Sequence, residues 1–244
     1  MGYSFVRDRV ELLRSRISDA AARAGRDPGG IELLAVTKFH PVEAALAAWD
    51  AGLRSFGESR VQEAEAKYAP FLSDHPSARL DMIGHLQSNK AKKAVAFFSR
   101  LQSVDSAELL LDLDARALAA DRRLEVLLEL HTGEESKEGF RDAEELYRAL
   151  DLLLSSGRRS LEPPGQGGLV PRGLMTMAPY SGDEAPIRDS FRALRAALEE
   201  CRGRFALPDF DVLSMGMSGD YRIAVEEGST LLRIGTALFG ERAA

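Results

Sequence analysis

Short apolar runs alternate with helical segments along the chain, and this alternation is the feature that most restricts its fold. Eight runs have the length and the apolar character of buried strands in a parallel sheet. They are separated by segments whose apolar residues recur at helical spacing. The predicted strands cover residues 31–36, 53–57, 79–84, 101–104, 124–130, 174–177, 211–214 and 231–234. This alternation is typical of α/β proteins with a parallel sheet.

The eightfold repetition favours a closed sheet, so we predict the α/β class and a single (β/α)8 TIM barrel with an extra N-terminal helix. A doubly wound open sheet is the alternative, but no GxGxxG follows an early strand. The extra helix is predicted over residues 3–24, where four apolar residues recur at spacings of four, three and four. These residues are Val6, Val10, Leu13 and Ile17. Because no change in composition marks a boundary, residues 1–244 are expected to form one domain.

Helices are also predicted between the strands, over residues 41–51, from near 59, and over 85–98, 140–154, 184–202 and 218–227. Ser106 is expected to cap a further helix that contains Leu109, Leu110 and Leu113. The Pro/Gly-rich segment at residues 155–173 is predicted to be a surface loop.

The composition excludes some classes of function. A formal net charge of −6 argues against a broad nucleic-acid surface, which needs clustered positive charge. No apolar run is long enough to span a bilayer, and the N-terminus lacks the apolar core of a signal peptide. We therefore expect a cytoplasmic protein with no membrane partner. The single cysteine, Cys201, lies late in a helical segment and is expected to be a packing residue.

The first predicted strand leads into a lysine that could carry chemistry. The stretch IELLAVTKFHP, residues 31–41, runs from a buried strand into Lys38, and Pro41 opens the next helix. A lysine held there can reach over the sheet edge. Desolvation would lower its pKa and make the amine a nucleophile towards aldehydes. From this stretch alone, a solvated lysine after a strand is the simpler interpretation.

Two loops rich in small residues follow the seventh and eighth predicted strands. They begin SMGMSGD at residues 214–220 and RIGT at residues 233–236. In barrels, phosphate groups favour the loops after these two strands. Glycine lets backbone N–H groups approach an anion, and hydroxyl side chains add donors. Either loop alone is also explained as a tight turn, but the two together indicate a phosphate-bearing ligand.

Arg233 lies within the apolar eighth strand, where an arginine is unusual unless it is paired or bound to a ligand. An ion pair with a barrel carboxylate such as Glu58 is one interpretation. The other combines an amine after the first strand, a phosphate site after the last two strands, and a cation beneath them. Pyridoxal 5′-phosphate carries an aldehyde and a phosphate on one small ring, and as a Schiff base it would satisfy all three.

Seven segments resemble those of the pyridoxal phosphate homeostasis proteins, a family similar in fold to the N-terminal barrel of bacterial alanine racemases. They are LLAVTKFHP, FGESRVQE, MIGHLQSNK, GEESKEG, RGLMTM, SMGMSGD and GSTLLRIGTALFGER. They occur in order from the first strand to the last helix. The resemblance implies a barrel that binds pyridoxal 5′-phosphate and acts in intracellular cofactor homeostasis, without established catalytic turnover.

The resemblance also implies roles for individual residues. Lys38 would form the Schiff base, and Arg233 would face the pyridine nitrogen. The phosphate would be held by Ser214, Gly235 and Thr236, with the backbone N–H of Met215 in addition. His85, just beyond the third strand, is a further candidate for contacting the cofactor at the mouth of the barrel. The alternative is that it only begins the next helix. Lys137, in the loop after the fifth strand, is a candidate second amine.

Two positions depart from the family pattern. The family usually shows FGEN, whereas Ser59 follows Glu58 in this chain. An asparagine expected at the end of the fifth strand is missing, with Leu130 or His131 in its place. Both changes affect secondary contacts to the cofactor.

Two functions from different classes are compatible with these residues: a carrier that hands the cofactor to apo enzymes, and an amino-acid racemase-like enzyme. Racemisation needs a second acid or base facing Lys38, which alanine racemases draw from a further domain. Because the chain ends at Ala244, soon after the eighth strand, we expect no turnover, with Tyr180 and Tyr221 as internal substitutes to test. A sugar-phosphate enzyme that uses Lys38 as an aldolase-type base is a weaker third hypothesis.

Overall fold

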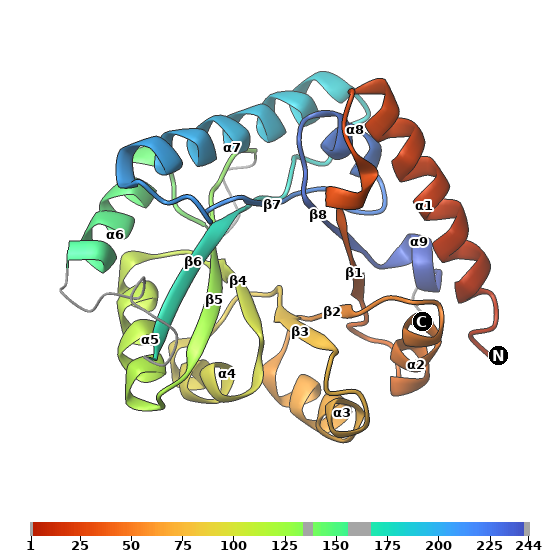
Figure 1. Cartoon of the computed structure of the whole chain (residues 1–244), viewed down its shortest axis with the longest axis horizontal. Coiled ribbons are helices and arrows are strands. Elements are labelled where there is room, and N and C mark those ends of the chain that lie inside the picture. Colours follow the sequence, from red (N-terminus) through yellow and green to blue (C-terminus); the bar gives the residue numbers. More distant parts are fainter. Residues whose placement is uncertain (1, 134–138, 156–166, 242–244) are drawn as a thin grey trace.

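The strands form a closed parallel barrel. The structure, a computed structural model, describes residues 2–133, 139–155 and 167–241. Each strand pairs with the next in the sequence, and β1 pairs with β8 to close the barrel (Figure 1). The strands are β1 Glu32–Val36, β2 Ser55–Glu58, β3 Arg79–Met82, β4 Arg100–Val104, β5 Arg123–Glu129, β6 Gly168–Met175, β7 Val212–Ser214 and β8 Leu231–Ile234. The predicted (β/α)8 barrel is therefore confirmed.

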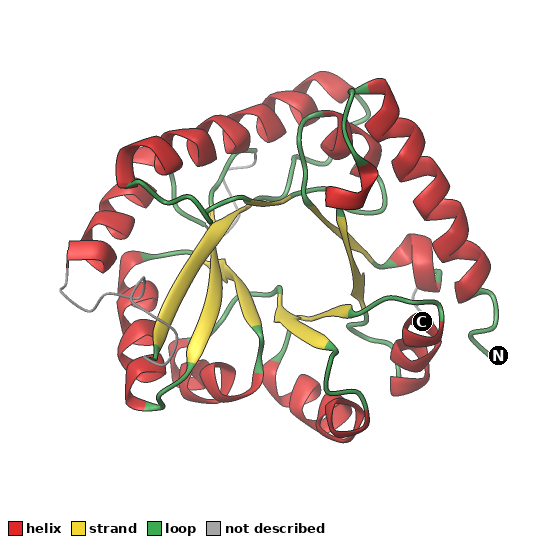
Figure 2. Cartoon of the chain, viewed as in Figure 1, coloured by secondary structure: helices red, strands yellow, loops and turns green. Residues whose placement is uncertain are grey.

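The helices surround the strands (Figure 2). They are α1 Val6–Arg23, α2 Val42–Asp50, α3 Val61–Asp74, α4 Ala91–Phe97, α5 Ala107–Ala119, α6 Ala143–Ser155, α7 Glu184–Phe205, α8 Tyr221–Glu226 and α9 Thr236–Phe239, with short 3₁₀ turns at Pro28–Gly30 and Ser88–Lys90. Helix α1 precedes the first strand, as predicted, and the four apolar residues of its predicted stripe are buried. It packs against α2, α8 and α9, so it covers the seam between the first and last repeats.

The interior of the barrel carries a chain of polar side chains. Arg100 Nε donates to Asp81 Oδ2 at 2.7 Å, and Gln102 Nε2 donates to the same oxygen at 2.5 Å. Ser214 Oγ then donates to Gln102 Oε1 at 2.6 Å. Because β4 and β7 are not neighbours in the sheet, this last bond crosses the barrel. Buried polar groups are usually hydrogen-bonded. These bonds link the side chains from Arg100 to the carboxyl end of β7, but Asp81 Oδ1 is buried without a hydrogen-bond partner among the residues described.

Strand β6 begins earlier than predicted. The strand covers Gly168–Met175, so the prediction of a surface loop is wrong from Gly168 onward. Residues 156–166 of that predicted loop lie outside the described residues. The register with β5 shifts between Pro171 and Gly173, which leaves Arg172 as a bulge. The bulge lets the sheet contain a proline, which cannot donate to the ladder. Gly173 is required, because a Cβ there would lie 1.9 Å from Val212 O.

Several helices begin later than predicted, for local reasons. Helix α4 begins at Ala91, after the 3₁₀ turn Ser88–Lys90, rather than at residue 85. Helix α6 begins at Ala143, because the Asp142 carboxylate accepts the N–H of Glu145 at 2.8 Å and caps that end. Ser106 caps α5 as predicted, accepting the N–H of Leu109 at 3.3 Å.

The first strand is only partly buried. Leu34, Ala35 and Val36 are buried, whereas Ile31 and Leu33 are half-buried, so the prediction of full burial is wrong for its first part. Cys201 is completely buried in α7, and burial raises the pKa of its thiol to about 12, as expected of a packing residue. In the parts of the chain that the structure describes, no helix combines the length and apolar character needed to cross a membrane.

Candidate functional site

A cavity of about 870 Å³ lies at the carboxyl ends of the strands, where barrels place their active sites. Its wall includes the last residue of β1, Val36, and segments that follow β3, β6, β7 and β8. Lys38, Arg233, Gly235 and Thr236 line this cavity. The structure therefore brings together four of the seven predicted cofactor-binding residues.

Lys38 lies in a tight turn directly after β1. The N–H of His40 donates to the carbonyl of Thr37 at 3.0 Å, so Lys38 and Phe39 are the two central residues of a β-turn. Lys38 is half-buried. Phe39 has a φ of 68°, in the left-handed region that large side chains rarely adopt. A rigid strand and a hydrogen-bonded turn thus place the lysine at the mouth of the barrel.

Arg233 is buried in β8 and is held by backbone and hydroxyl oxygens. Its Nη1 donates to the carbonyl and to the Oγ of Ser214, at 2.8 and 2.6 Å. Its Nη2 donates to the carbonyl of Thr176 at 2.8 Å. The predicted alternative, an ion pair with Glu58, is wrong, because Glu58 Oε1 pairs with Lys67 Nζ at 2.6 Å.

The electrostatic surroundings keep Arg233 charged near neutral pH. Burial lowers the pKa of its guanidinium to about 10, against the opposing charges of Glu129 and Asp220. Three of its five N–H groups are used in the bonds above. The Nε–H and one N–H of Nη2 have no protein acceptor among the residues described. Because Arg233 also lines the cavity, these groups are suited to a ligand.

Ser214 and Met215 do not line the cavity, and their predicted phosphate roles stay predictions. The Ser214 hydroxyl is fully buried, accepts from Arg233 and donates to Gln102, so its single proton is used. The N–H of Met215 donates to the carbonyl of Leu231 at 3.2 Å, as part of the pairing of β7 with β8. Both residues stabilise the barrel beneath the site.

The loops after β7 and β8 line the cavity with small and hydroxyl-bearing residues. Ser218 and Gly219 line the cavity from the first loop, and Gly235 and Thr236 line it from the second. The N–H of Ala237 donates to Ser218 Oγ at 3.1 Å and joins the two loops. Within the described residues, the N–H groups of Gly235 and Thr236 have no protein acceptor. Backbone N–H groups left in this way are suited to an anion such as a phosphate.

Three polar residues of the site were not predicted. Thr176, after β6, contributes the carbonyl that holds Arg233. Glu129 is buried at the end of β5, where a charged residue in an apolar run could have been noticed. Asp220 lines the cavity and accepts the N–H of Met217 at 2.5 Å. Burial raises the pKa of Asp220, against that N–H and the charge of Arg233, which lower it.

The remaining predicted residues have mixed positions. His85 does not line the cavity. Its Nδ1 lies 3.0 Å from Oδ2 of Asp105, the residue that follows β4. Tyr180 lines the cavity, whereas Tyr221 is buried outside it. Lys137 lies outside the described residues. Neither departure from the family pattern, at Ser59 or at Leu130 and His131, contributes to the cavity wall.

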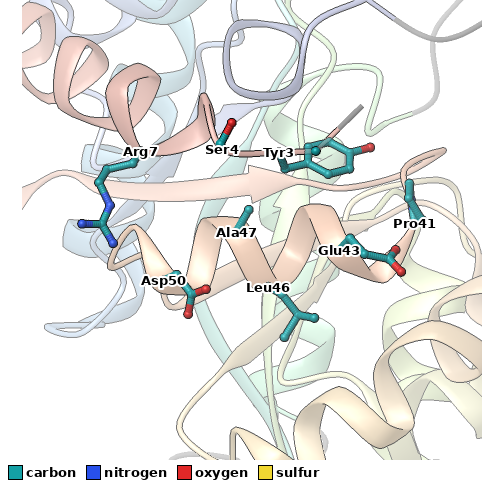
Figure 3. Close-up of a pocket in the computed structure, with 9 residues that line it drawn as sticks. Tyr3, Ser4, Arg7, Pro41, Glu43, Leu46, Ala47 and Asp50 are labelled. Atoms are coloured by element: carbon teal, nitrogen blue, oxygen red, sulfur yellow. The ribbon is translucent and has the colours of Figure 1, made fainter.

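A second cavity, of about 600 Å³, lies on the outside of the barrel between the start of α1 and α2 (Figure 3). Tyr3, Ser4 and Arg7 line one side, and Glu43, Leu46 and Asp50 are among the residues on the other. Since none of the predicted site residues that the structure describes lines this cavity, the mouth of the barrel is the stronger candidate.

Comparison with known proteins gives concordant matches over nearly the full length. The family model described as "Alanine racemase, N-terminal domain" matches residues 10–243. The pyridoxal phosphate homeostasis protein of Vibrio alginolyticus is 34% identical over 242 residues, covering 98% of each chain. That of Pseudomonas aeruginosa is 36% identical over 242 residues, covering 98% of this chain and 96% of its own.

Solved structures agree. PipY of Synechococcus elongatus PCC7942, solved with PLP bound, superimposes with a TM-score of 0.81 at 36% identity, covering 96% of this chain and 100% of its own. An alanine racemase of Clostridium difficile 630 superimposes with a TM-score of 0.73 at 12% identity, covering 97% of this chain and 58% of its own. At that identity the racemase shows a shared fold only.

Proposed function

This chain belongs to the alanine racemase N-terminal domain family, together with the pyridoxal phosphate homeostasis proteins, and from that premise we propose that it binds pyridoxal 5′-phosphate. Its proposed role is to hold the cofactor and to supply it to apo enzymes that depend on it. The observation that carries this proposal is the single cavity in which Lys38, Arg233 and the two glycine-containing loops meet.

The residues of the cavity fit this cofactor. An amine, a buried guanidinium with two N–H groups left for a ligand, and a group of backbone N–H donors line one space. The donors of Gly235 and Thr236 suit the phosphate, because hydrogen bonds to an anion are stronger than neutral ones. The guanidinium suits the ring nitrogen, which is an acceptor. The aldehyde, the phosphate and the ring nitrogen of the cofactor thus each have a complementary group among the residues that line the cavity.

When bound, pyridoxal 5′-phosphate supplies an aldehyde that reacts reversibly with an amine, and we assign that amine to Lys38. The turn after β1 restricts where the lysine can reach. The loops joined by the bond from Ala237 to Ser218 hold the phosphate donors in place. Arg233 is fixed by three hydrogen bonds, so its position is set before any ligand binds.

Arg233 also limits the chemistry of the site. Its pKa of about 10 keeps it positive at neutral pH. A nearby cation disfavours protonation of a pyridine nitrogen. An unprotonated ring withdraws electrons less strongly, so the arrangement favours holding the cofactor over turning over amino acids.

Amino-acid racemisation is the second candidate function, and one observation favours it. Tyr180 lines the same cavity as Lys38, so a second acid or base is present at the barrel mouth. Holo protein incubated with L-alanine and other amino acids, and followed by chiral chromatography, tests this. Racemisation at an ordinary enzymatic rate, about 1–10³ s⁻¹, that disappears in Lys38→Ala and in Tyr180→Phe would replace the carrier proposal with the enzymatic one.

The cofactor proposal is tested by reductive trapping. Protein incubated with pyridoxal 5′-phosphate should absorb visible light, and borohydride followed by peptide mass mapping should place a pyridoxyl mass on the Lys38 peptide. Lys38→Ala should abolish the label, while the surface variant Lys93→Ala should retain it, because Lys93 pairs with Glu65 away from the cavity. Label mainly on Lys137, or none on the wild-type protein, would contradict the assignment.

A further inference from the structure

The turn that carries Lys38 has an unfavourable backbone conformation. Phe39 occupies the second central position with a φ of 68°, a conformation that glycine adopts readily and a large aromatic side chain does not. The side chain of Phe39 is 53% exposed, so burial of its ring does not account for this conformation. Contacts from elsewhere in the fold must therefore stabilise the turn.

Lys67, on α3, makes two such contacts with the backbone of the turn. Its Nζ donates to the carbonyl of Thr37 at 2.8 Å and to the carbonyl of His40 at 2.8 Å. These carbonyls belong to the first and last residues of the turn. The third partner of Nζ is Glu58 Oε1, at 2.6 Å. An ammonium group has three N–H donors, so all of them are used.

The pair of Lys67 and Glu58 is buried and has further support. The side chain of Lys67 is 12% exposed and that of Glu58 is 1% exposed. Thr37 Oγ1 donates to Glu58 Oε1 at 2.7 Å and lies 2.6 Å from the hydroxyl of Tyr68. Because the single proton of Thr37 goes to the carboxylate, Tyr68 must donate to Thr37. Burial raises the pKa of Tyr68, which keeps its proton in place.

We propose that Lys67 is a positioning residue for Lys38: by bridging both ends of the Thr37–His40 turn, it holds the strained conformation that presents Lys38 to the cavity. This inference rests on the proposed function of Lys38. Lys67 does not line the cavity and so acts only through the turn. Glu58 sets the direction of the ammonium group, because it accepts one N–H and leaves the other two for the carbonyls.

The test is a double-mutant comparison between Lys67→Met and Phe39→Gly. In the wild-type background, Lys67→Met should slow the capture of pyridoxal 5′-phosphate, measured by the rise in visible absorbance, by about tenfold or more. In the Phe39→Gly background the loss should be much smaller, because glycine adopts a positive φ without support. Lys93→Met is the matched control, since it removes an exposed lysine and should capture at the wild-type rate.

Two further measurements separate positioning from folding and from cofactor binding. Glu58→Gln combined with Lys67→Met removes the buried charge as well, and should regain stability while capture stays slow. Trace acetylation of the cofactor-free protein, with mass spectrometry of the Lys38 peptide, reports the lysine without cofactor and should show the same dependence on Phe39→Gly. An equal effect of Lys67→Met in both backgrounds would overturn the inference. So would capture at the wild-type rate by the Glu58→Gln/Lys67→Met variant. A wild-type protein that captures no cofactor would refute the proposed function, and the acetylation rates would still decide the role of Lys67.

Discussion

Replacing Ser214 with alanine tests the hypothesis that this hydroxyl positions Arg233 rather than touching a ligand. The Oγ atom is fully buried, accepts from Arg233 Nη1 at 2.6 Å and donates to Gln102 Oε1 at 2.6 Å. Its removal loses a hydrogen bond to a charged group, worth about 1.5–3 kcal/mol, and a neutral one worth about 1 kcal/mol. Arg233 keeps the carbonyls of Ser214 and Thr176, so the guanidinium is not left without acceptors. The expected loss in the free energy of unfolding is therefore about 2–4 kcal/mol.

Urea unfolding of the cofactor-free protein, followed by circular dichroism, measures this loss, and Ser218→Ala is the matched control. The Ser218 hydroxyl is half-buried at the cavity and accepts from Ala237, so water can replace it and the expected loss is below about 1 kcal/mol. In cofactor titrations, Ser218→Ala should bind more weakly than the wild type, because it removes a group of the proposed phosphate site. A Ser214→Ala protein as stable as the wild type, or a Ser218→Ala protein less stable than Ser214→Ala, would refute the reasoning.

Three further predictions follow from the same geometry. Gly235→Ala should leave stability unchanged, because its Cβ would lie 3.5 Å from Val36, an ordinary contact distance. It should weaken cofactor binding in titrations, because Gly235 lines the cavity at the proposed phosphate site. Gly216→Ala should instead unfold at lower urea, because its φ is +98° and its Cβ would meet a side chain at 2.5 Å. Burial raises the pKa of Asp81 to about 6 from 3.8, against the charge of Arg100, so its folded form binds the proton more tightly. The unfolding free energy of the wild type relative to Asp81→Asn should therefore fall as pH rises from about 4 to about 6 in a urea series, and a constant or rising difference would contradict this. Arg100→Met should cost about 3–5 kcal/mol in the same assay, since it leaves a buried carboxylate unpaired; a loss below about 1 kcal/mol would show that the charge is relieved by other means.

The local sequence was sufficient to predict most of the helices and strands. It also predicted the location of residues that directly follow the end of a strand. Lys38 follows β1, and Gly235 and Thr236 follow β8, so a parallel barrel places all three at one mouth as soon as the sheet closes. The periodicity of α1 likewise predicted its buried face. The start of β6 was missed because Pro171 and the glycines around it are typical of loops, and only pairing with β5 through a bulge makes them a strand.

The roles of the polar side chains required the tertiary structure, because their partners lie far away in the sequence. Ser214 is a reasonable phosphate ligand by position, yet its hydroxyl bonds to Gln102 on a strand across the barrel and to Arg233. The partner of Glu58 is Lys67 on α3 rather than Arg233, and the spacing of charges along the chain does not show this. Strand ends determine which backbone positions surround the site. Hydrogen bonds across a closed barrel depend on which side chains face inward together, and that is decided only when the sheet closes.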